Sequence, residues 1–434
     1  MKRLLAFGIA GALVASPMAA GMAQQAAPAP RPAPAAAQPL AATQALFDGY
    51  VAQKKMPGIV GAFGVADAPT VFVSAGTIAD GGARADANSL WRVYSMTKPV
   101  TGIAAMLLVE DGKIALDDPL SKYFPAFKTM RVLTQPDTSL DSVPATREIT
   151  IRQLLTHTSG LGYNISAKGP LLQEYERLGL LPGQVNVAME GPASRTRPTS
   201  LAAFAEAVAK APLVNQPGTK WHYSIGLDVM GAVIEKASGM PFDAFVKARI
   251  LDPLGMTSTF WQVPAADVGR FATNYAIAGA TRVPLDPAAT SVYLRKPAFP
   301  YGGAGLVSSA RDYDRFLHML QNRGALGQAR LMRPETAALA MSNLLPAGVT
   351  FKLDQLPAAP MGFGAGGFVT LTDSPAAGRG TYGWDGAANT FAFVDPNRRV
   401  RGVVMVNFFP YGVYPLRAEV AQALAADAAR LHGK

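Results

Sequence analysis

Ser95 and Lys98 are the two residues whose types and spacing could most directly do chemistry. They lie three residues apart at the start of a predicted apolar helix, so both side chains share one helix face. A serine hydroxyl becomes a good nucleophile when a neighbour takes its proton, and a lysine amine can do so when desolvation keeps it partly neutral. The helix N-terminus adds positive potential that favours a developing oxyanion. Taken alone, S-x-x-K is typical of an N-cap serine and a solvated lysine, but in an apolar helix this lysine must extend to water or serve a site.

Two segments further along the chain could complete such a site. The first is Tyr223-Ser224-Ile225, and the second is Trp384-Asp385-Gly386, which we expect between two strand-like runs. Each segment is a weak signal by itself.

Other chemical signatures are missing or point elsewhere. The sequence has neither G-x-S-x-G nor G-x-x-x-x-G-K-[ST]. Gly362, Gly364 and Gly367 match G-x-G-x-x-G, but the residues 368–371 that follow resemble a strand. Dinucleotide binding needs a helix there, so these glycines instead indicate that a neighbouring segment approaches the backbone closely.

Composition excludes several classes of function. The chain has no cysteine, which rules out disulfides, thiolate catalysis and metal–thiolate centres. Four histidines without H-E-x-x-H argue against a histidine metal site, so we predict neither a metal nor a cofactor. The net charge of +10 comes from scattered basic residues and therefore does not indicate a nucleic-acid partner.

The N-terminus is typical of an exported protein. Lys2 and Arg3 precede an apolar run that ends before small residues, which predicts a signal peptide over residues 1–23. Residues 24–41 are rich in alanine and proline and predict a solvated tether. We therefore expect a periplasmic or secreted protein of bacterial type, with no membrane span after cleavage.

The elements that must position the chemical groups come from both ends of the chain. Strand-like and helical patterns at the two ends flank a middle that is rich in helical periodicity, which predicts a sheet-based domain (42–115 and 296–434) interrupted by a helical insertion (116–295). We expect Ser309 and Asp312 to form a capping box. The predicted helices are 46–55, 96–110, 227–237, one that follows Ser309, and 415–431, and the predicted strands are 59–65, 70–73, 367–371, 390–394 and 400–407.

The order and spacing of these motifs resemble the serine β-lactamase and penicillin-binding-protein superfamily, most closely the class C β-lactamase-like (family VIII) carboxylesterases. The resemblance extends over about residues 42–430. It implies an α/β (α+β) fold of the β-lactamase/transpeptidase type, with an antiparallel sheet flanked by helices. Further family-like segments in family-like order are Leu116-Asp117-Asp118-Pro119, Tyr123-Phe124-Pro125, residues 154–160, 251–256 and 302–306, and Asp395-Pro396.

The resemblance also implies a role for each matching residue. Ser95 would be the acyl-accepting nucleophile, and Lys98 and Tyr223 would share the acid and base work. The backbone N–H groups of Ser95 and Ala387 would form the oxyanion hole.

Two departures from the lactamase pattern bear on the substrate. Ile225 replaces the asparagine of Tyr-x-Asn, and Trp384 stands where a lactamase has Lys-Thr-Gly. With Asp385 and Gly386, these residues are the predicted substrate pocket. The cation that docks a β-lactam carboxylate is missing, and Asp385 would add repulsion if it faced the site. We therefore predict a carboxylesterase for short, neutral esters.

Several alternatives remain open at this stage. A β-lactamase, a D,D-peptidase or an acyltransferase could use the same acyl-enzyme, and a non-catalytic protein could bind peptidoglycan fragments with the same fold. The small-molecule ester is the only partner we predict, and the sequence does not indicate an oligomeric state. His157 lies in a turn that is structural in the family, and residues 408–411 fit either an acyl pocket or the core.

Overall fold

The computed structural model describes residues 40–279, 281–351, 360–374 and 377–432. The predicted signal peptide and residues 24–39 of the predicted tether lie outside the described residues. Neither prediction is therefore tested by the structure.

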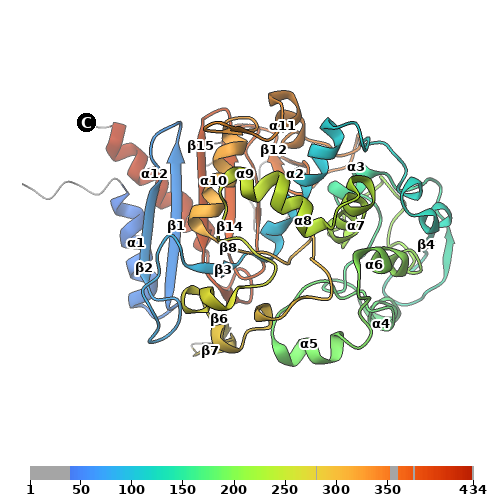
Figure 1. The fold of residues 1–434 in the computed structure, drawn as a ribbon, viewed down its shortest axis with the longest axis horizontal. Coiled ribbons are helices and arrows are strands. Elements are labelled where there is room, and N and C mark those ends of the chain that lie inside the picture. Colours follow the sequence, from blue (N-terminus) through green and yellow to red (C-terminus); the bar gives the residue numbers. More distant parts are fainter. Residues whose placement is uncertain (1–39, 280, 352–359, 375–376, 433–434) are drawn as a thin grey trace, which may run out of the picture. The chain divides into compact units, whose positions relative to one another are not determined.

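A seven-stranded antiparallel sheet organises the described part of the chain (Figure 1). Two strands from the N-terminal part lie beside five from the C-terminal part, in the order β11-β12-β13-β14-β15-β1-β2. Residues far apart in sequence therefore meet in one sheet. The strands are β1 (Gly58–Val65), β2 (Val71–Gly76), β11 (Met361–Phe363), β12 (Phe368–Thr370), β13 (Tyr382–Asp385), β14 (Phe391–Asp395) and β15 (Val400–Met405).

Helices cover both faces of this sheet. Helices α1 (Ala41–Ala52) and α12 (Leu416–His432) pack together on one face, and α10 (Ala310–Gln321) packs against β1, β14 and β15 from the other (Figure 1). Seven of the eight residues of β1 are buried, which is why its sequence is apolar without alternation. In register, Val60 lies opposite Met405 and Val65 opposite Val400.

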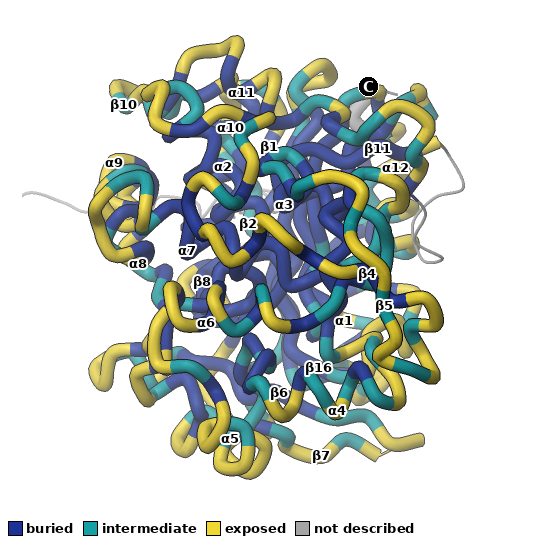
Figure 2. The backbone as a smooth tube through the Cα atoms, turned by 90° about the vertical axis from the view of Figure 1, so that its right-hand side faces the viewer, coloured by how far each residue is buried: buried dark blue, intermediate teal, exposed yellow. Residues whose placement is uncertain are grey.

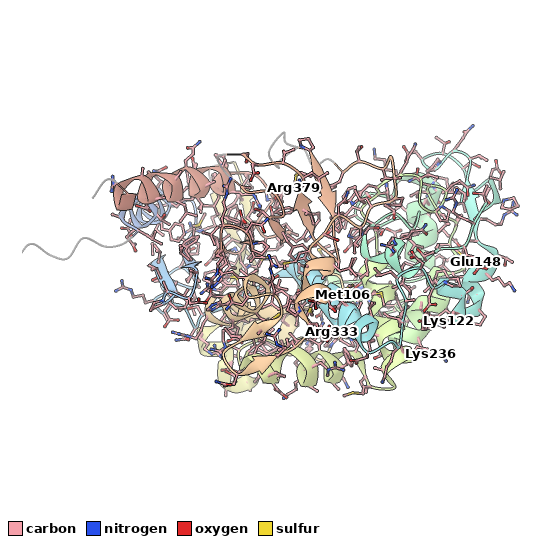
Figure 3. All side chains as sticks on the ribbon, turned by 90° about the horizontal axis from the view of Figure 1, so that it is seen from above. Met106, Lys122, Glu148, Lys236, Arg333 and Arg379 are labelled. Carbon is pink, nitrogen blue, oxygen red and sulfur yellow. The ribbon has the colours of Figure 1, made fainter. Side chains whose placement is uncertain are left out.

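Helix α2 (Thr97–Glu110) lies between the sheet and the helical part of the chain. Met106 on this helix is labelled near the centre of Figure 3 and is fully buried. The helix packs on α7 (Gly226–Ser238), α8 (Phe242–Val246) and α11 (Pro334–Ala340), so its side chains are enclosed on all sides. This burial explains why its sequence is mostly apolar.

The middle of the chain is mainly helical. Lys122, Glu148 and Lys236, labelled in Figure 3, lie on this helical side, away from α1 and α12. The predicted boundaries of the insertion stay a prediction. The remaining elements are α3 (Ile151–Leu155), α4 (Gly169–Arg177), α5 (Val187–Ala193), α6 (Leu201–Val208), α9 (Asp252–Leu254), β3 (Leu90–Arg92), β4 (Arg131–Leu133), β5 (Ser142–Pro144), β6 (Asn274–Ala278), β7 (Thr281–Asp286), β8 (Val307–Ser309), β9 (Ala325–Leu326), β10 (Ala329–Arg330) and β16 (Phe408–Phe409).

Burial follows this arrangement. The tube in Figure 2 is buried along the central strands and the inner helices and exposed along the outer loops. A single large apolar cluster joins residues of α2, α7 and α10 with the inner face of the sheet. Within the described residues, no helix has both the length and the apolar character needed to cross a membrane.

The first helix differs from its prediction for a long-range reason. It begins at Ala41, not Leu46, and ends at Ala52. The Asp427 carboxylate on α12 accepts hydrogen bonds from the N–H groups of Ala42 and Thr43 and from Thr43 Oγ1. This cap comes from the other end of the chain, so no local pattern could indicate it.

Two further expectations need correction. Ser309 caps α10 by accepting from the Asp312 N–H, but the Asp312 carboxylate accepts from Ser258 N and Thr259 Oγ1, so no capping box forms. The prediction also missed a small sheet in which β6 lies between β7 and β16. The pairing of β6 with β16 joins segments more than a hundred residues apart, which a local pattern does not reveal.

Candidate active site

Ser95, Lys98 and Tyr223 come together at the N-terminal end of α2. Lys98 Nζ donates to Ser95 Oγ over 3.1 Å, and the Tyr223 hydroxyl donates to the same oxygen over 2.7 Å. Ser95 is 8% exposed and Lys98 is fully buried. A nucleophilic oxygen in contact with two groups that can exchange protons is the arrangement that acyl transfer requires.

The Lys98 ammonium also lies against aromatic faces. Its Nζ is 4.6 Å from the centroid of the Tyr223 ring and 5.5 Å from that of Tyr163. Both contacts place the positive charge over an electron-rich ring face, which is a cation–π interaction.

The backbone that carries Ser95 is strained. Residues Tyr94–Met96 form one 3₁₀ turn ahead of α2, and Tyr94 has a φ of +42°. Its ring packs edge-on against Tyr293 and Phe409, and its hydroxyl accepts from Asn274 Nδ2 over 3.0 Å. These contacts hold a conformation that a tyrosine rarely adopts and thereby fix the direction of the next residue, Ser95.

The glycine-rich segment 302–306 anchors the first turns of α2. Lys98 Nζ donates to Gly303 O over 2.7 Å, and Thr101 Oγ1 donates to Gly302 O over 2.7 Å. In return, the Leu306 N–H donates to Thr97 Oγ1 over 3.0 Å. A Cβ on Gly302 would lie 2.4 Å from the Leu227 carbonyl oxygen, so this segment must be glycine to reach α2 and α7 together.

His157 supports the segment that carries Tyr223. The imidazole is fully buried, and its Nδ1 accepts from Ser224 N over 3.2 Å and lies 2.9 Å from Ser224 Oγ. Its ring packs 4.8 Å from that of Tyr223, and burial keeps the pKa of His157 well below its ordinary value. His157 is therefore neutral and positions Tyr223 through packing, in keeping with the structural role expected of its turn.

The backbone N–H groups of Ser95 and Ala387 are the predicted oxyanion hole, and this role stays a prediction. The end of β13 closely approaches the residue before the 3₁₀ turn, because a Cβ on Gly386 would lie 2.4 Å from Val93 O. Two backbone donors on adjoining segments can together hold a developing negative charge.

Asn389 locks the turn that carries Ala387. It adopts a φ of +66°, and its Nδ2 donates to Phe408 O over 2.7 Å and to Pro410 O over 3.2 Å. Its Oδ1 accepts from Gly412 N over 2.8 Å. Asparagine tolerates this left-handed conformation better than most residues, so the turn is fixed by both backbone and side chain.

The predicted pocket residues lie in different environments. Trp384 lies on β13, not between strands as predicted, and its Nε1 donates to Tyr223 Oη over 3.4 Å. Its ring packs with those of Phe351, Phe363 and Phe368 in an aromatic cluster. Ile225 is wholly buried in the main core, so it offers a substrate no surface in this state of the protein.

Asp385 neither faces a substrate freely nor points to bulk solvent. Its carboxylate pairs with the Arg417 guanidinium and accepts from the Tyr411 hydroxyl over 2.5 Å. Arg417 in turn lies 5.3 Å above the rings of Phe368 and Phe391. The repulsion of anions expected from Asp385 is therefore largely offset, because Arg417 supplies the opposite charge.

The glycines of the G-x-G-x-x-G pattern do bring two backbones together. They lie on the hairpin of β11 and β12. A Cβ on Gly364 would lie 2.5 Å from Ala340 O, and one on Gly367 would lie 2.7 Å from Gly383 O. The close backbone approach predicted from this pattern is confirmed.

Comparison with known proteins agrees with this geometry. A family model described as Beta-lactamase matches residues 43–427. Esterase EstB of Burkholderia gladioli is 34% identical over 330 residues, which cover 71% of this chain and 74% of EstB. Lovastatin esterase of Penicillium rubens is 32% identical over 326 residues, with 71% and 77% coverage. The solved structure of EstCE1, a hydrolase with promiscuous acyltransferase activity, is 26% identical with a TM-score of 0.72, covering 89% of this chain and 99% of EstCE1.

Proposed function

This chain belongs to the Beta-lactamase family and is a serine hydrolase with that family's fold, and from that premise we propose that it is a carboxylesterase for short, neutral esters. One observation carries the proposal: Ser95 Oγ lies within hydrogen-bond distance of both Lys98 Nζ and Tyr223 Oη. Similarity to EstB and to lovastatin esterase supports the same class of reaction.

In the proposed reaction, Ser95 Oγ attacks the ester carbonyl carbon while its proton passes to the Tyr223 phenolate oxygen, which the Lys98 ammonium stabilises. The N–H groups of Ser95 and Ala387 hold the resulting oxyanion, and one such donor is worth roughly 2.7–4 kcal/mol of barrier. The bond to the alcohol then breaks, and the alcohol leaves with the proton from Tyr223. Water attacks the acyl-Ser95 ester by the same route and releases the acid.

The preference for neutral esters rests on the surroundings of β13. Trp384 is apolar and packs within the aromatic cluster, so its position offers no cation to a substrate carboxylate. Asp385 and Arg417 form a pair whose charges cancel. An uncharged acyl group needs no charged partner here, whereas a β-lactam carboxylate would lack the cation that binds it in a lactamase.

Acyl transfer to an alcohol is the second candidate function. The likeness to EstCE1, whose description includes promiscuous acyltransferase activity, favours it. An alcohol would simply replace water in the second half of the reaction. Product analysis with a short alcohol as co-substrate would separate transfer from hydrolysis, because only transfer yields a new ester.

A substrate panel tests the proposed preference. We expect kcat/KM for p-nitrophenyl butyrate to exceed that for a chromogenic cephalosporin by about 100-fold, since a charge-assisted hydrogen bond worth roughly 3 kcal/mol is missing. Initial rates for both substrates under one set of conditions give the ratio. Equal efficiencies would refute the preference for neutral esters.

Asp385→Asn tests whether the charge pair sets this preference. The substitution removes the carboxylate charge but keeps a side chain of similar shape, so Arg417 becomes an uncompensated cation beside β13. We expect the ratio of kcat/KM for an anionic ester over a neutral ester to rise about fivefold, equivalent to roughly 1 kcal/mol for a partly exposed charge. The gain should shrink in high salt because added ions screen it.

Asp67→Asn is the matched control for this change. Asp67 pairs with Arg399 at the protein surface, so its substitution alters the net charge equally without touching β13. The control should leave the substrate ratio unchanged. A ratio that moves equally in both variants would assign the effect to net charge and contradict the local role of Asp385.

A further inference from the structure

Asp228 is a buried carboxylate that no step of the proposed reaction uses. It lies in the first turn of α7 and is 1% exposed. Its Oδ1 accepts from the Gly303 N–H over 2.8 Å, while its Oδ2, among the described residues, is buried without a hydrogen-bond partner. A buried carboxylate is costly unless hydrogen bonds and a nearby positive charge offset it.

The backbone of Gly303 connects this carboxylate to Lys98. The Gly303 N–H donates to Asp228, and the Gly303 carbonyl accepts from Lys98 Nζ over 2.7 Å. A Cβ on Gly303 would lie 2.5 Å from Asp228 Oδ2, so only glycine lets the two groups approach from both sides. Within the described part of the chain, Lys98 makes no direct salt bridge with an acid, and the Asp228 carboxylate is the anion placed to offset it.

We propose that Asp228 is a positioning residue for Lys98: its carboxylate offsets the charge of the buried lysine and, through Gly303, directs the ammonium toward Ser95. This inference rests on the proposed function, in which Ser95 forms the acyl-enzyme. A buried ammonium loses its proton readily when nothing offsets its charge. With Lys98 held as a cation, Tyr223 is the group that takes the serine proton.

The other ionisable groups near Asp228 do not replace it. Lys98, Tyr163 and Tyr301 are the groups whose charges act on it or respond to it. Burial raises the pKa of both tyrosines, which are neutral phenols at pH 7. Burial also raises the pKa of Asp228 to about 6, although Lys98 and the backbone N–H groups of Gly303, Asp228 and Gly302 lower it, so Asp228 is an anion at pH 7 and is protonated in mild acid.

Asp228→Asn replaces the charged carboxylate with a neutral amide, whose oxygen can still accept from the Gly303 N–H. Without the anion, the Lys98–Tyr223 pair gives up its proton more easily, so the acid limb of the kcat/KM profile should move to lower pH by one unit or more, the usual effect of a nearby charge. The pair is then a weaker base, and the plateau value of kcat should fall about tenfold or more. A merely structural role would lower kcat without moving the limb.

Two variants sharpen this test. Asp228→Glu restores the charge, so its acid limb should return toward that of the wild type even if kcat stays low. Asp312→Asn removes another buried carboxylate, which accepts from Ser258 N and Thr259 Oγ1 and not from Gly303 or Lys98. This variant should leave the acid limb of the pH profile in place. An Asp228→Asn profile that superimposes on that of the wild type would overturn the inference.

Lysine-selective NMR of the wild-type protein covers the case in which Asp228→Asn does not fold. Loss of one resonance in Lys98→Ala assigns the lysine, and its chemical shift should be that of an ammonium at pH 7. A neutral Lys98 at that pH would overturn the inference. Failure of the proposed function gives a different result, because Ser95→Ala would then keep its esterase activity. If Ser95→Ala is inactive but the pH profile of Asp228→Asn does not move, only the role of Asp228 is refuted.

Discussion

Ser95→Ala should abolish ester turnover while the protein keeps its fold. The substitution removes the oxygen that both Lys98 Nζ and Tyr223 Oη contact, and no acyl-enzyme can form without it. Losing the nucleophile of a hydrolase typically costs about 10⁶-fold in kcat, so we expect no rate above background. Intact mass after treatment with a fluorophosphonate should show one adduct on the wild type and none on the variant.

The control for this loss is a buried serine outside the site. Ser308→Ala removes a hydroxyl that bonds with Thr259, and the variant should still accept the fluorophosphonate. Circular dichroism and thermal melting of both variants check the fold. If Ser95→Ala kept more than a few per cent of kcat, a different serine would be the nucleophile. If the wild type bound esters but formed no adduct, the non-catalytic alternative would gain support.

The parts of the site that sequence could predict are those with local spacing. Ser95 and Lys98 are joined by one turn of backbone, so their contact follows from helical geometry alone. Tyr223 lies more than a hundred residues away, so its place beside Ser95 could be predicted only from the resemblance to a family in which these motifs occur in the same order. The antiparallel sheet flanked by helices was likewise predicted and is confirmed.

The parts that sequence could not predict depend on contacts between distant segments. The Asp385–Arg417 pair joins a strand to the C-terminal helix, and neither residue indicates the other in the sequence. Tyr94 holds its strained backbone through Asn274 and Phe409, which are equally remote. Each of these contacts exists only once the chain has folded.

Asp228 did leave a signal that sequence reasoning missed. It is the single charged residue in the stretch 225–234, which is otherwise apolar and uncharged. A lone carboxylate in the first turn of an apolar helix must find compensation inside the fold, because burial of an unpaired charge is strongly unfavourable. The same reasoning singled out Lys98 in its own apolar helix, and the structure brings these two residues to opposite sides of Gly303.

The last prediction concerns the hydroxyl of Tyr223, and its control is Tyr313→Phe, which removes the hydroxyl of a different tyrosine. Tyr313 is buried in the protein core, whereas Tyr223 is partly buried, and Tyr313 donates to Met96 O over 2.8 Å, one residue after the nucleophile. Its loss removes a structural hydrogen bond worth about 1 kcal/mol of stability, and kcat should change little by comparison. Any large effect specific to Tyr223 must then come from chemistry at Ser95.

Tyr223→Phe should lower kcat by about 10²- to 10⁴-fold, the usual contribution of a positioned acid or base. The phenyl ring keeps the packing against His157 and Trp384, so the fold and the aromatic cluster are preserved. What is lost is the oxygen that lies 2.7 Å from Ser95 Oγ. Because this oxygen takes the serine proton and returns it to the leaving alcohol, activated esters with good leaving groups should suffer less than alkyl esters. Equal losses for both, or an unchanged pH–rate profile, would assign the proton transfer to Lys98 instead.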